Sequence, residues 1–262
     1  MLNSNHFRYF LIAFTLLTLA FLSYSCSDSA TGPGENMPAP EFNSKAAPGD
    51  SAKSFLVGDQ YSSLQVEIDY MPGHRPTQNG LDSLKTFLER RLNKQNITFR
   101  DPTEIPSGGQ GSYSASEIRD IEENNRDYFT EAGDNTLQVY FLMVDGEFSA
   151  NSNVLGIAYW NTSVAFFGET IESISGSPPL NPSEEKIEGT VFRHEFGHNM
   201  GLVGIGTPTQ SDHKTDNSAH CTTDGCLMEP AVETTDFFSN FSGEIPPLGQ
   251  LCIDDLQANG GK

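Results

Sequence analysis

Hydrophobic and polar residues alternate along several segments of the chain with the periods of strands and helices. Residues 64–70 alternate with a period of two, which predicts a strand with one buried face. A run of leucines between positions 81 and 92 recurs at helical spacing and predicts an amphipathic helix. Residues 137–144 and 154–167 are rich in Val, Ile, Tyr and Phe, which favours strands.

Three further segments complete this pattern. Residues 96–100 predict a short strand, residues 116–129 a polar surface helix, and residues 248–258 a C-terminal helix. The order of elements is then strand, helix, strand, helix, strand, strand. This order is typical of an α/β (α+β) domain, in which helices pack on a mixed sheet.

A longer helix follows these strands. Asn181 can cap its first turn, Pro182 suits the first helical position, and Glu184 stands three residues after the cap. The pattern continues to about Met200, and Gly201 is well placed to end the helix in a left-handed turn.

The first 25 residues differ from the rest of the chain. Arg8 is the only formal charge before an apolar run at 10–22, which is too short to cross a bilayer core of about 30 Å as a helix. A basic start followed by a short apolar run is typical of an export signal. The sequence Ser-Tyr-Ser-Cys at 23–26 resembles a relaxed lipobox, which implies cleavage before Cys26 and acylation of its thiol. A plain secretory signal is the alternative.

These features divide the chain into a lipoprotein-type signal peptide at 1–25, a tether at 26–54 and a folded domain at 55–262. The tether is rich in Ser, Gly, Pro, Ala, Asn and Asp, so it buries too little apolar surface to offset the entropy of ordering. We therefore expect an exported protein that a lipid anchors to the bacterial cell envelope. With a plain secretory signal, the protein would instead be secreted.

The charge balance excludes several kinds of partner. Lys and Arg total 15 against 35 Asp and Glu, a net charge of −20. Nucleic-acid binding needs clustered cations that neutralise phosphates, so we expect none. The same balance argues against a basic membrane-binding face, so membrane contact would occur only through the anchor. We expect a monomer.

The helix ending near Met200 carries the sequence His-Glu-Phe-Gly-His. His194 and His198 are separated by one helical turn, so both imidazoles can reach one metal ion. Glu195 can lean over an open coordination position and take a proton from metal-bound water. The alternative is a surface helix with two unrelated histidines.

The residues that follow make the pattern more specific. The string continues His-Asn-Met-Gly-Leu, and a second string, His-Cys-x4-Cys-x-Met, begins at His220 and ends at Met228. Together they resemble the metzincin zinc metallopeptidases, and archaemetzincins most closely. The resemblance implies that His220 is the third zinc ligand and that Met228 forms the Met-turn beneath the metal, with the C-terminal helix packed under this turn. It also implies that a peptide substrate pairs with an edge strand, for which residues 154–167 are the candidate.

Residues 204–219 are an insertion relative to that signature. The insertion contains His213, which is an alternative third ligand. A zinc peptidase of the gluzincin type, whose third ligand is a glutamate on a later helix, is a further alternative. Its candidates are Glu229, Glu233 and Glu244, which lie in a Pro-, Thr- and Gly-rich stretch.

The cysteines also depart from the family pattern. Archaemetzincins hold a second, structural zinc with cysteines, but Asp255 stands here where the last one is expected. Cys221, Cys226 and Cys252 with Asp255 can hold such a zinc. One disulfide with one odd cysteine is the alternative in an oxidising envelope.

The sequence therefore predicts a zinc-dependent metallopeptidase that acts on a peptide or protein substrate. Glu195 would assist attack of zinc-bound water on the peptide carbonyl, with one catalytic Zn²⁺ and a second, structural zinc as an option. The alternative from another class is a non-catalytic lipoprotein that binds zinc or peptides through a metzincin-like domain.

Overall fold

The computed structural model describes residues 41–176, 181–239 and 243–262. The predicted signal peptide, Cys26 and the tether up to residue 40 lie outside the described residues. Within the described ranges, no helix combines the length and apolar character that crossing a bilayer requires.

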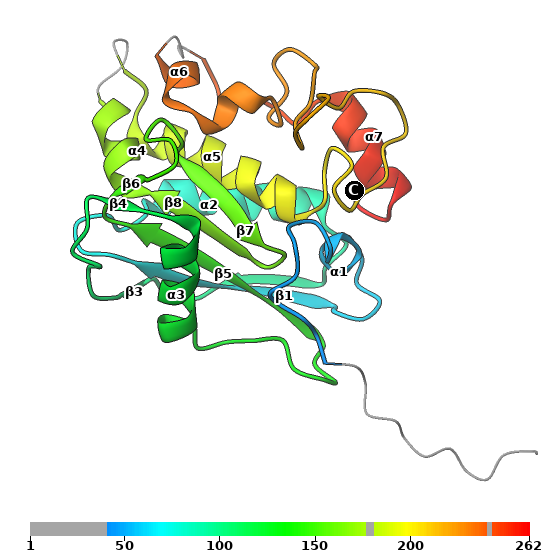
Figure 1. Cartoon of the computed structure of the whole chain (residues 1–262). Helices are drawn as coiled ribbons and strands as arrows, with labels where there is room; N and C mark the ends of the chain where they lie inside the picture. Colours follow the sequence, from blue (N-terminus) through cyan, green and yellow to red (C-terminus); the bar gives the residue numbers. More distant parts are fainter. Residues whose placement is uncertain (1–40, 177–180, 240–242) are drawn as a thin grey trace, which may run out of the picture. The chain divides into compact units, whose positions relative to one another are not determined.

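A six-stranded sheet forms the centre of the domain (Figure 1). Its order is β2-β1-β5-β8-β7, and β3 pairs with β1 beyond the end of β2. All neighbours pair in parallel except β7, which lies antiparallel to β8 at the edge. The strands are β1 (Ser63–Tyr70), β2 (Asn96–Phe99), β3 (Thr103–Glu104), β5 (Thr136–Val144), β7 (Gly156–Trp160) and β8 (Ser163–Phe167), with a separate pair β4 (Ser112–Tyr113) and β6 (Glu147–Phe148).

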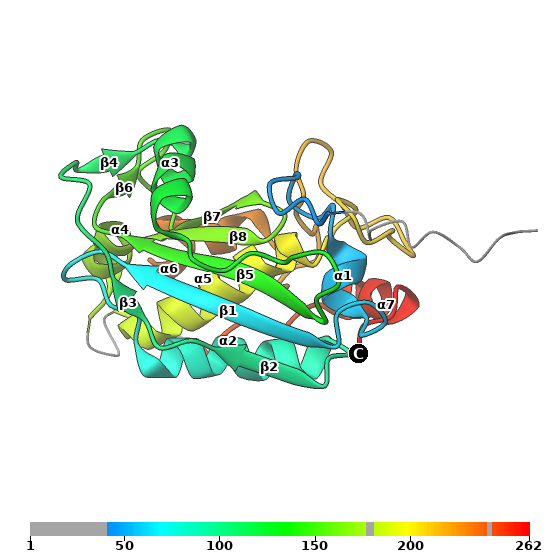
Figure 2. The same cartoon turned by 90° about the horizontal axis from the view of Figure 1, so that it is seen from below.

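Helices cover both faces of this sheet. Those described are α1 (Ala52–Leu56), α2 (Gln78–Arg91), α3 (Ala115–Asn125), α4 (Gly168–Ile174), α5 (Glu184–Asn199), α6 (Thr235–Phe238) and α7 (Gln250–Ala258), with a 3₁₀ turn, η1 (Pro230–Glu233). Two views show α2 and α5 on one face and α3 on the other (Figures 1 and 2). The prediction of a mixed sheet with packed helices is confirmed.

Alternation along β5 supplies a hydrophobic core on each face, because successive strand residues point in opposite directions. Val139 and Phe141 belong to the core that includes α5, where the Phe141 and Phe192 rings lie 4.8 Å apart. Leu142 belongs to the second core, with Ile118 of α3. A strand buried on both faces is typically a continuous apolar run, which is the pattern of residues 139–144.

The prediction that β1 has only one buried face is wrong. Glu67 and Asp69 point to the second face and are 5% and 3% exposed. The chain that follows α3 covers them, and the backbone N–H groups of Asp127 and Tyr128 donate to the Glu67 carboxylate at 2.8 and 3.0 Å. The Tyr140 hydroxyl donates to Asp69 at 2.8 Å. These hydrogen bonds compensate for burial of the two acids.

Asp69 makes the stability of the domain depend on pH. Burial raises the pKa of Asp69 to about 6, with smaller contributions from the charges of Glu67 and Asp127. The unfolded value is about 3.9, so the folded chain binds the proton more tightly and stability falls as pH rises from about 4 to 6. We expect Asp69→Asn to gain about 1 kcal/mol at pH 7.5 and nothing below pH 4. Thermal unfolding of both proteins across this range tests it, and an equal difference at every pH would contradict it.

Several boundaries differ from the sequence prediction. The helix expected at 116–129 ends at Asn125, and residues 154–167 form two strands joined by a turn. The N-cap of α5 is Ser183 instead of Asn181. The helices α1, α4 and α6 were not expected.

Packed structure also begins before the predicted boundary at 55. The Asn161 side chain donates to the Asn43 carbonyl at 2.8 Å and to the Ser51 hydroxyl at 2.6 Å. It accepts from the Ala46 N–H at 3.1 Å. These bonds hold residues 43–51 against the turn between β7 and β8.

Candidate metal centre

Helix α5 carries the first two histidines of the site. The helix is buried along most of its length and contacts α2, β7 and β8. His194 and His198 project from one side of it, and their Nε2 atoms lie 3.1 Å apart. The helix ends as predicted, with Gly201 in the left-handed region at φ 74°. This turn starts the excursion that returns the chain to the same helix.

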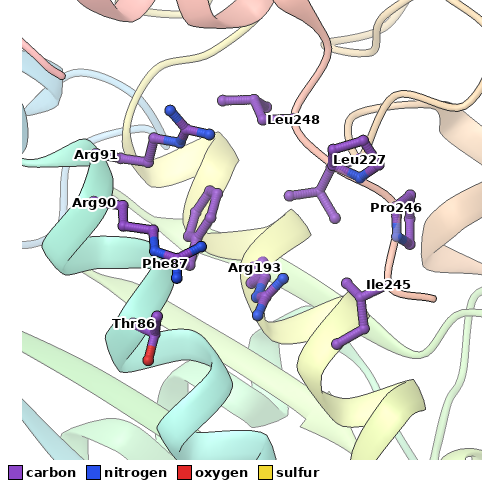
Figure 3. A pocket seen from close by; sticks show the side chains of 10 residues that line it. Thr86, Phe87, Arg90, Arg91, Arg193, Leu227, Ile245, Pro246 and Leu248 are labelled. Carbon is purple, nitrogen blue, oxygen red and sulfur yellow. The ribbon is translucent and has the colours of Figure 1, made fainter.

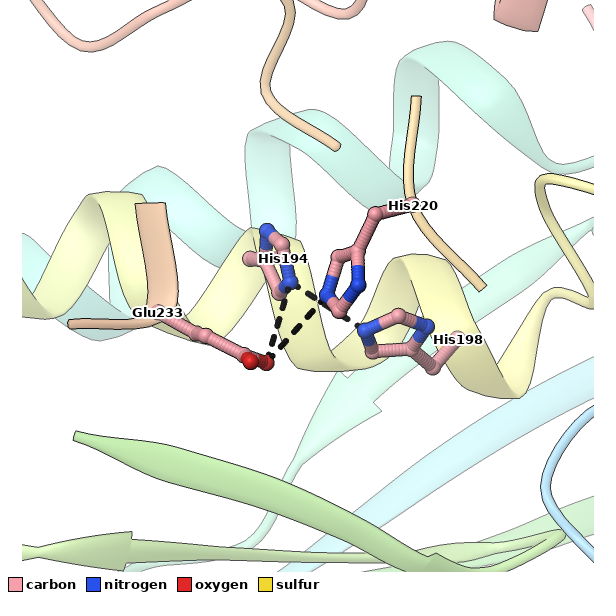
Figure 4. A group of neighbouring side chains, drawn as sticks. All are labelled: His194, His198, His220 and Glu233. Carbon is pink, nitrogen blue, oxygen red and sulfur yellow. Dashed lines mark hydrogen bonds and ion pairs between the residues drawn. The ribbon is translucent and has the colours of Figure 1, made fainter. Parts of the chain in front are cut away.

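His220 approaches these two residues at the end of that excursion (Figure 4). Its ring stacks on His194 with centroids 5.2 Å apart and lies 5.0 Å from the ring of His198. The return is held by backbone bonds, because the Thr215 N–H donates to the His220 carbonyl at 2.9 Å and the Cys221 N–H to the Met228 carbonyl at 2.7 Å. The three imidazoles predicted as ligands therefore lie together.

The protonation of these rings suits metal binding. The Nδ1 atom of His194 lies 2.7 Å from the Leu227 carbonyl, which can only accept, so Nδ1 carries the proton and Nε2 presents a lone pair to the centre. Burial, followed by the proximity of His194 and His220, holds the pKa of His198 well below its ordinary value. The buried Nε2 of His220 has no hydrogen-bond partner among the described residues. A cation between these nitrogens would satisfy all three.

Glu233 completes this group. The sequence indicated this residue only as a candidate ligand in the gluzincin alternative. Its Oε2 lies 3.3 Å from His220 Nε2 and 3.6 Å from His194 Nε2. All four donor atoms lie within 4.8 Å of one another. Burial alone would raise the pKa of Glu233, but hydrogen bonds and charge from the His194 and His220 rings, when these rings are protonated, outweigh burial and lower this pKa. A cation between the rings would favour the ionised carboxylate in the same way.

The donor set fits zinc. Nitrogen and oxygen ligands about 2.0–2.2 Å from a tetrahedral zinc lie about 3.3–3.6 Å from one another. Three of the separations between the donor atoms of this group are 3.1, 3.3 and 3.6 Å. Imidazole and carboxylate are also among the ligands that zinc takes in proteins.

Glu195 lies beside this group, between α5 and the edge strand β7. Its side chain is buried, and its Oε1 has no hydrogen-bond partner among the described residues. Burial raises the pKa of Glu195 well above its ordinary value, and the negative charge of Glu233 raises it further, while a hydrogen bond from the Ala158 backbone opposes the shift. The Glu195 carboxyl therefore lies against the strand at the sheet edge.

Met228 lies beneath the histidines. It is fully buried, and its sulfur contacts Gly197, which stands between His194 and His198 on the helix. A side chain at position 197 would occupy the space of this sulfur. Met228 therefore packs against the turn of α5 that carries His194 and His198.

His213 and the cysteines form a second group. His213 Nε2 lies 3.6 Å from Cys252 Sγ, and Cys226 Sγ lies 3.8 Å from the same sulfur. Cys221 also belongs to this group. The three thiols are free in the structure. His213, the alternative third ligand, therefore lies apart from the three-histidine group.

This second group also fits zinc. Thiolates about 2.3 Å from a tetrahedral zinc lie about 3.8 Å apart, and a thiolate and an imidazole nitrogen about 3.6 Å apart. His213 Nδ1 lies 3.1 Å from the Ser211 carbonyl and so carries the proton. Its Nε2 faces the buried Asp255 Oδ2 at 3.2 Å, so the two atoms can hold a proton or a cation between them. Hydrogen bonding to Cys252 and from backbone N–H groups lowers the pKa of Cys226 to about 6.

A separate cavity of about 190 Å³ lies between α2, α5 and the segment at 245–248 (Figure 3). Arg90, Arg91 and Arg193 line it together with Leu227. None of the four metal-group residues lines this cavity. Leu227, one of the residues that line it, accepts the His194 hydrogen bond through its carbonyl.

No protein-family model matches the chain, and no curated protein matches its sequence. Among solved structures, the chain is similar to the archaemetzincin from Methanopyrus kandleri. The TM-score is 0.49 and the sequence identity 14%, over 77% of this chain and 96% of the other.

Proposed function

We propose that this chain is a zinc-dependent metallopeptidase. The observation that carries the proposal is the convergence of His194, His198 and His220 beside Glu195, whose carboxylate faces the edge strand β7. Three neutral imidazoles form the ligand set of a catalytic zinc, whereas a structural site is closed by four ligands from the protein.

The chemistry divides between the metal and Glu195. A bound zinc supplies a Lewis acid and lowers the pKa of a coordinated water toward about 7. Glu195 accepts the proton of the attacking water and delivers it to the leaving amine. Its buried position supports this role, because a carboxylate in a low-dielectric site takes up a proton readily.

The edge strand provides a place for the substrate. β7 pairs with β8 on one side, and its other side is the edge of the sheet. An extended peptide can add to such an edge through main-chain hydrogen bonds. The Ala158 backbone interacts with Glu195, so a peptide along β7 would lie next to the catalytic carboxylate.

Gly156 should be essential to this arrangement. A Cβ at this position would lie 2.8 Å from the Phe166 ring and 2.9 Å from Glu195 Cγ, so β7 or Glu195 must shift. We expect Gly156→Ala to lower hydrolysis by about 10- to 100-fold and to cost about 1–3 kcal/mol of stability. Gly111→Ala is the control, since a Cβ there meets nothing. Peptide turnover and thermal unfolding measure both effects, and a variant equal to this control would contradict the role of Gly156.

The second group supports a structural zinc held by His213, Cys221, Cys226 and Cys252, with Asp255 beside His213.

We also propose that the protein is an exported lipoprotein. The apolar run at 10–22 and Cys26 support this proposal. Incorporation of a labelled fatty acid should be lost in Cys26→Ser.

A second function is non-catalytic binding of zinc or a peptide. The position of Glu233 among the histidines favours it. A fourth protein ligand is typical of a closed site. Turnover of a peptide library, with and without a chelator, separates the two functions.

The test of the main proposal combines metal content with activity. We expect two zinc ions in each purified chain, one of which is lost in His194→Ala and the other in Cys221→Ser. Hydrolysis should stop with a chelator and return with added zinc. Hydrolysis that persists without metal, or a chain that binds none at the three histidines, would refute the proposal.

A further inference from the structure

We propose that Glu233 is the fourth protein ligand of the metal in the resting chain, and that a peptide entering along β7 displaces it. The metal centre is then latent until substrate binds. This inference rests on the proposed function and adds a mode of regulation to it.

The first support is the geometry of the donor atoms. Glu233 Oε2 lies 3.3 and 3.6 Å from two of the three imidazole nitrogens that surround the centre, close to the separation of neighbouring corners in a zinc tetrahedron. The side chain is only 25% exposed and points from η1 toward the histidines (Figure 4). The carboxylate therefore occupies the direction from which a water or a peptide carbonyl would approach.

The second support is the way the Glu233 segment is held. The Leu155 N–H donates to the Glu233 carbonyl at 2.9 Å, and the Thr235 N–H donates to the Asn153 carbonyl at 2.9 Å. Val154 and Thr234 form an antiparallel bridge between them. Residues 233–235 thus pair with residues 153–155 in the way a substrate strand would, immediately before the first residue of β7.

These two observations couple peptide binding to the metal. A peptide that pairs with β7 and continues toward Val154 competes for the backbone groups that now bind residues 233–235. When the peptide takes the place of residues 233–235 on this edge, the Glu233 carboxylate moves away from the histidines, because Glu233 belongs to the same short segment. A peptide that ends opposite Gly156 leaves the segment in place.

Small anions test whether the fourth position is closed. We would load the full chain with Co²⁺ and follow its visible absorption during titration with azide, which binds only at an open position. We expect Glu233→Gln to bind azide at least tenfold more tightly than the wild type. A competing chelator should also remove Zn²⁺ from this variant at a chelator concentration at least tenfold lower than the wild type requires. Asp236→Asn removes a charge from an exposed site three residues away and should match the wild type.

A second variant tests the pairing of residues 233–235 with residues 153–155, here called the latch, and leaves the Glu233 carboxylate intact. Thr235→Pro removes the N–H that donates to Asn153, and position 235 is the first residue of a helix, where proline is tolerated. We expect this variant also to bind azide more tightly than the wild type. It serves as the independent test if Glu233→Gln fails to retain metal.

The results separate this inference from the proposed function. Equal azide affinity in the wild type, Glu233→Gln and Thr235→Pro would overturn the latch, even if the protein cleaves peptides. Stronger azide binding in the variants, with no peptide cleavage by any of them, would support the latch and refute the peptidase.

Discussion

Replacing Glu195 with glutamine is expected to lower peptide hydrolysis about a thousandfold while the chain keeps its zinc. The Glu195 carboxylate is buried beside the three histidines and is not one of the four donor atoms that converge there. Glutamine has nearly the same shape but cannot accept a proton from water. The expected loss lies within the range of about 10²–10⁴ that general acid–base catalysis contributes.

The measurement compares kcat, KM and zinc content of Glu195→Gln with those of the wild type. The reduction should appear in kcat, because under the proposed mechanism a substrate would be held by backbone pairing with β7 and not by this carboxylate. Glu184→Gln is the matched control, since Glu184 lies on the same helix but is exposed. A Glu195→Gln protein that cleaves peptides at the wild-type rate would show that another group moves the proton.

Local spacing was enough to predict part of the centre. The i, i+4 separation of His194 and His198 places both rings on one side of any helix, so it requires no knowledge of the fold. The resemblance of the later string to a family signature indicated His220 and Met228. The structure brings these residues together through a turn at Gly201, which was recognisable because glycine tolerates its positive φ.

Long-range pairing explains what sequence analysis missed. Glu233 reaches the histidines because its segment pairs with residues 153–155, and no local pattern encodes a pairing between segments so far apart. His213 was considered as a third ligand beside His194 and His198, but it lies with the cysteines and with Asp255, which comes from a helix more than forty residues later. The alternation in β1 predicted solvated Glu67 and Asp69, but Glu67 is bound by the chain after α3 and Asp69 by Tyr140 of β5, neither of which a local pattern reveals.

The second large effect concerns the stability of the cysteine group. Loss of a bound structural zinc removes about 4 kcal/mol when free zinc exceeds its dissociation constant about a thousandfold. We therefore expect Cys252→Ser and His213→Ala to unfold at least about 10 °C below the wild type, each with one zinc fewer. Both side chains are buried in this group, and Cys252 stands on α7 while His213 stands in the insertion. The metal would add to the contacts that already join these segments, such as the Gln210 N–H that donates to Asp255 at 2.6 Å.

Asp212→Asn provides the control, because Asp212 is the exposed neighbour of His213 and should change neither zinc content nor unfolding temperature. Alkylation of the unfolded mature chain under non-reducing, metal-free conditions should modify Cys221, Cys226 and Cys252, whereas a disulfide would leave one reactive thiol. Cys252→Ser that keeps both zinc ions would exclude this cysteine as a ligand. A variant that loses one zinc but unfolds at the wild-type temperature would show that the group binds metal without stabilising the fold.

Because the Met228 carbonyl and the Cys226 sulfur both accept backbone N–H bonds within the turn beneath the histidines, loss of this zinc should also weaken zinc binding at His194, His198 and His220.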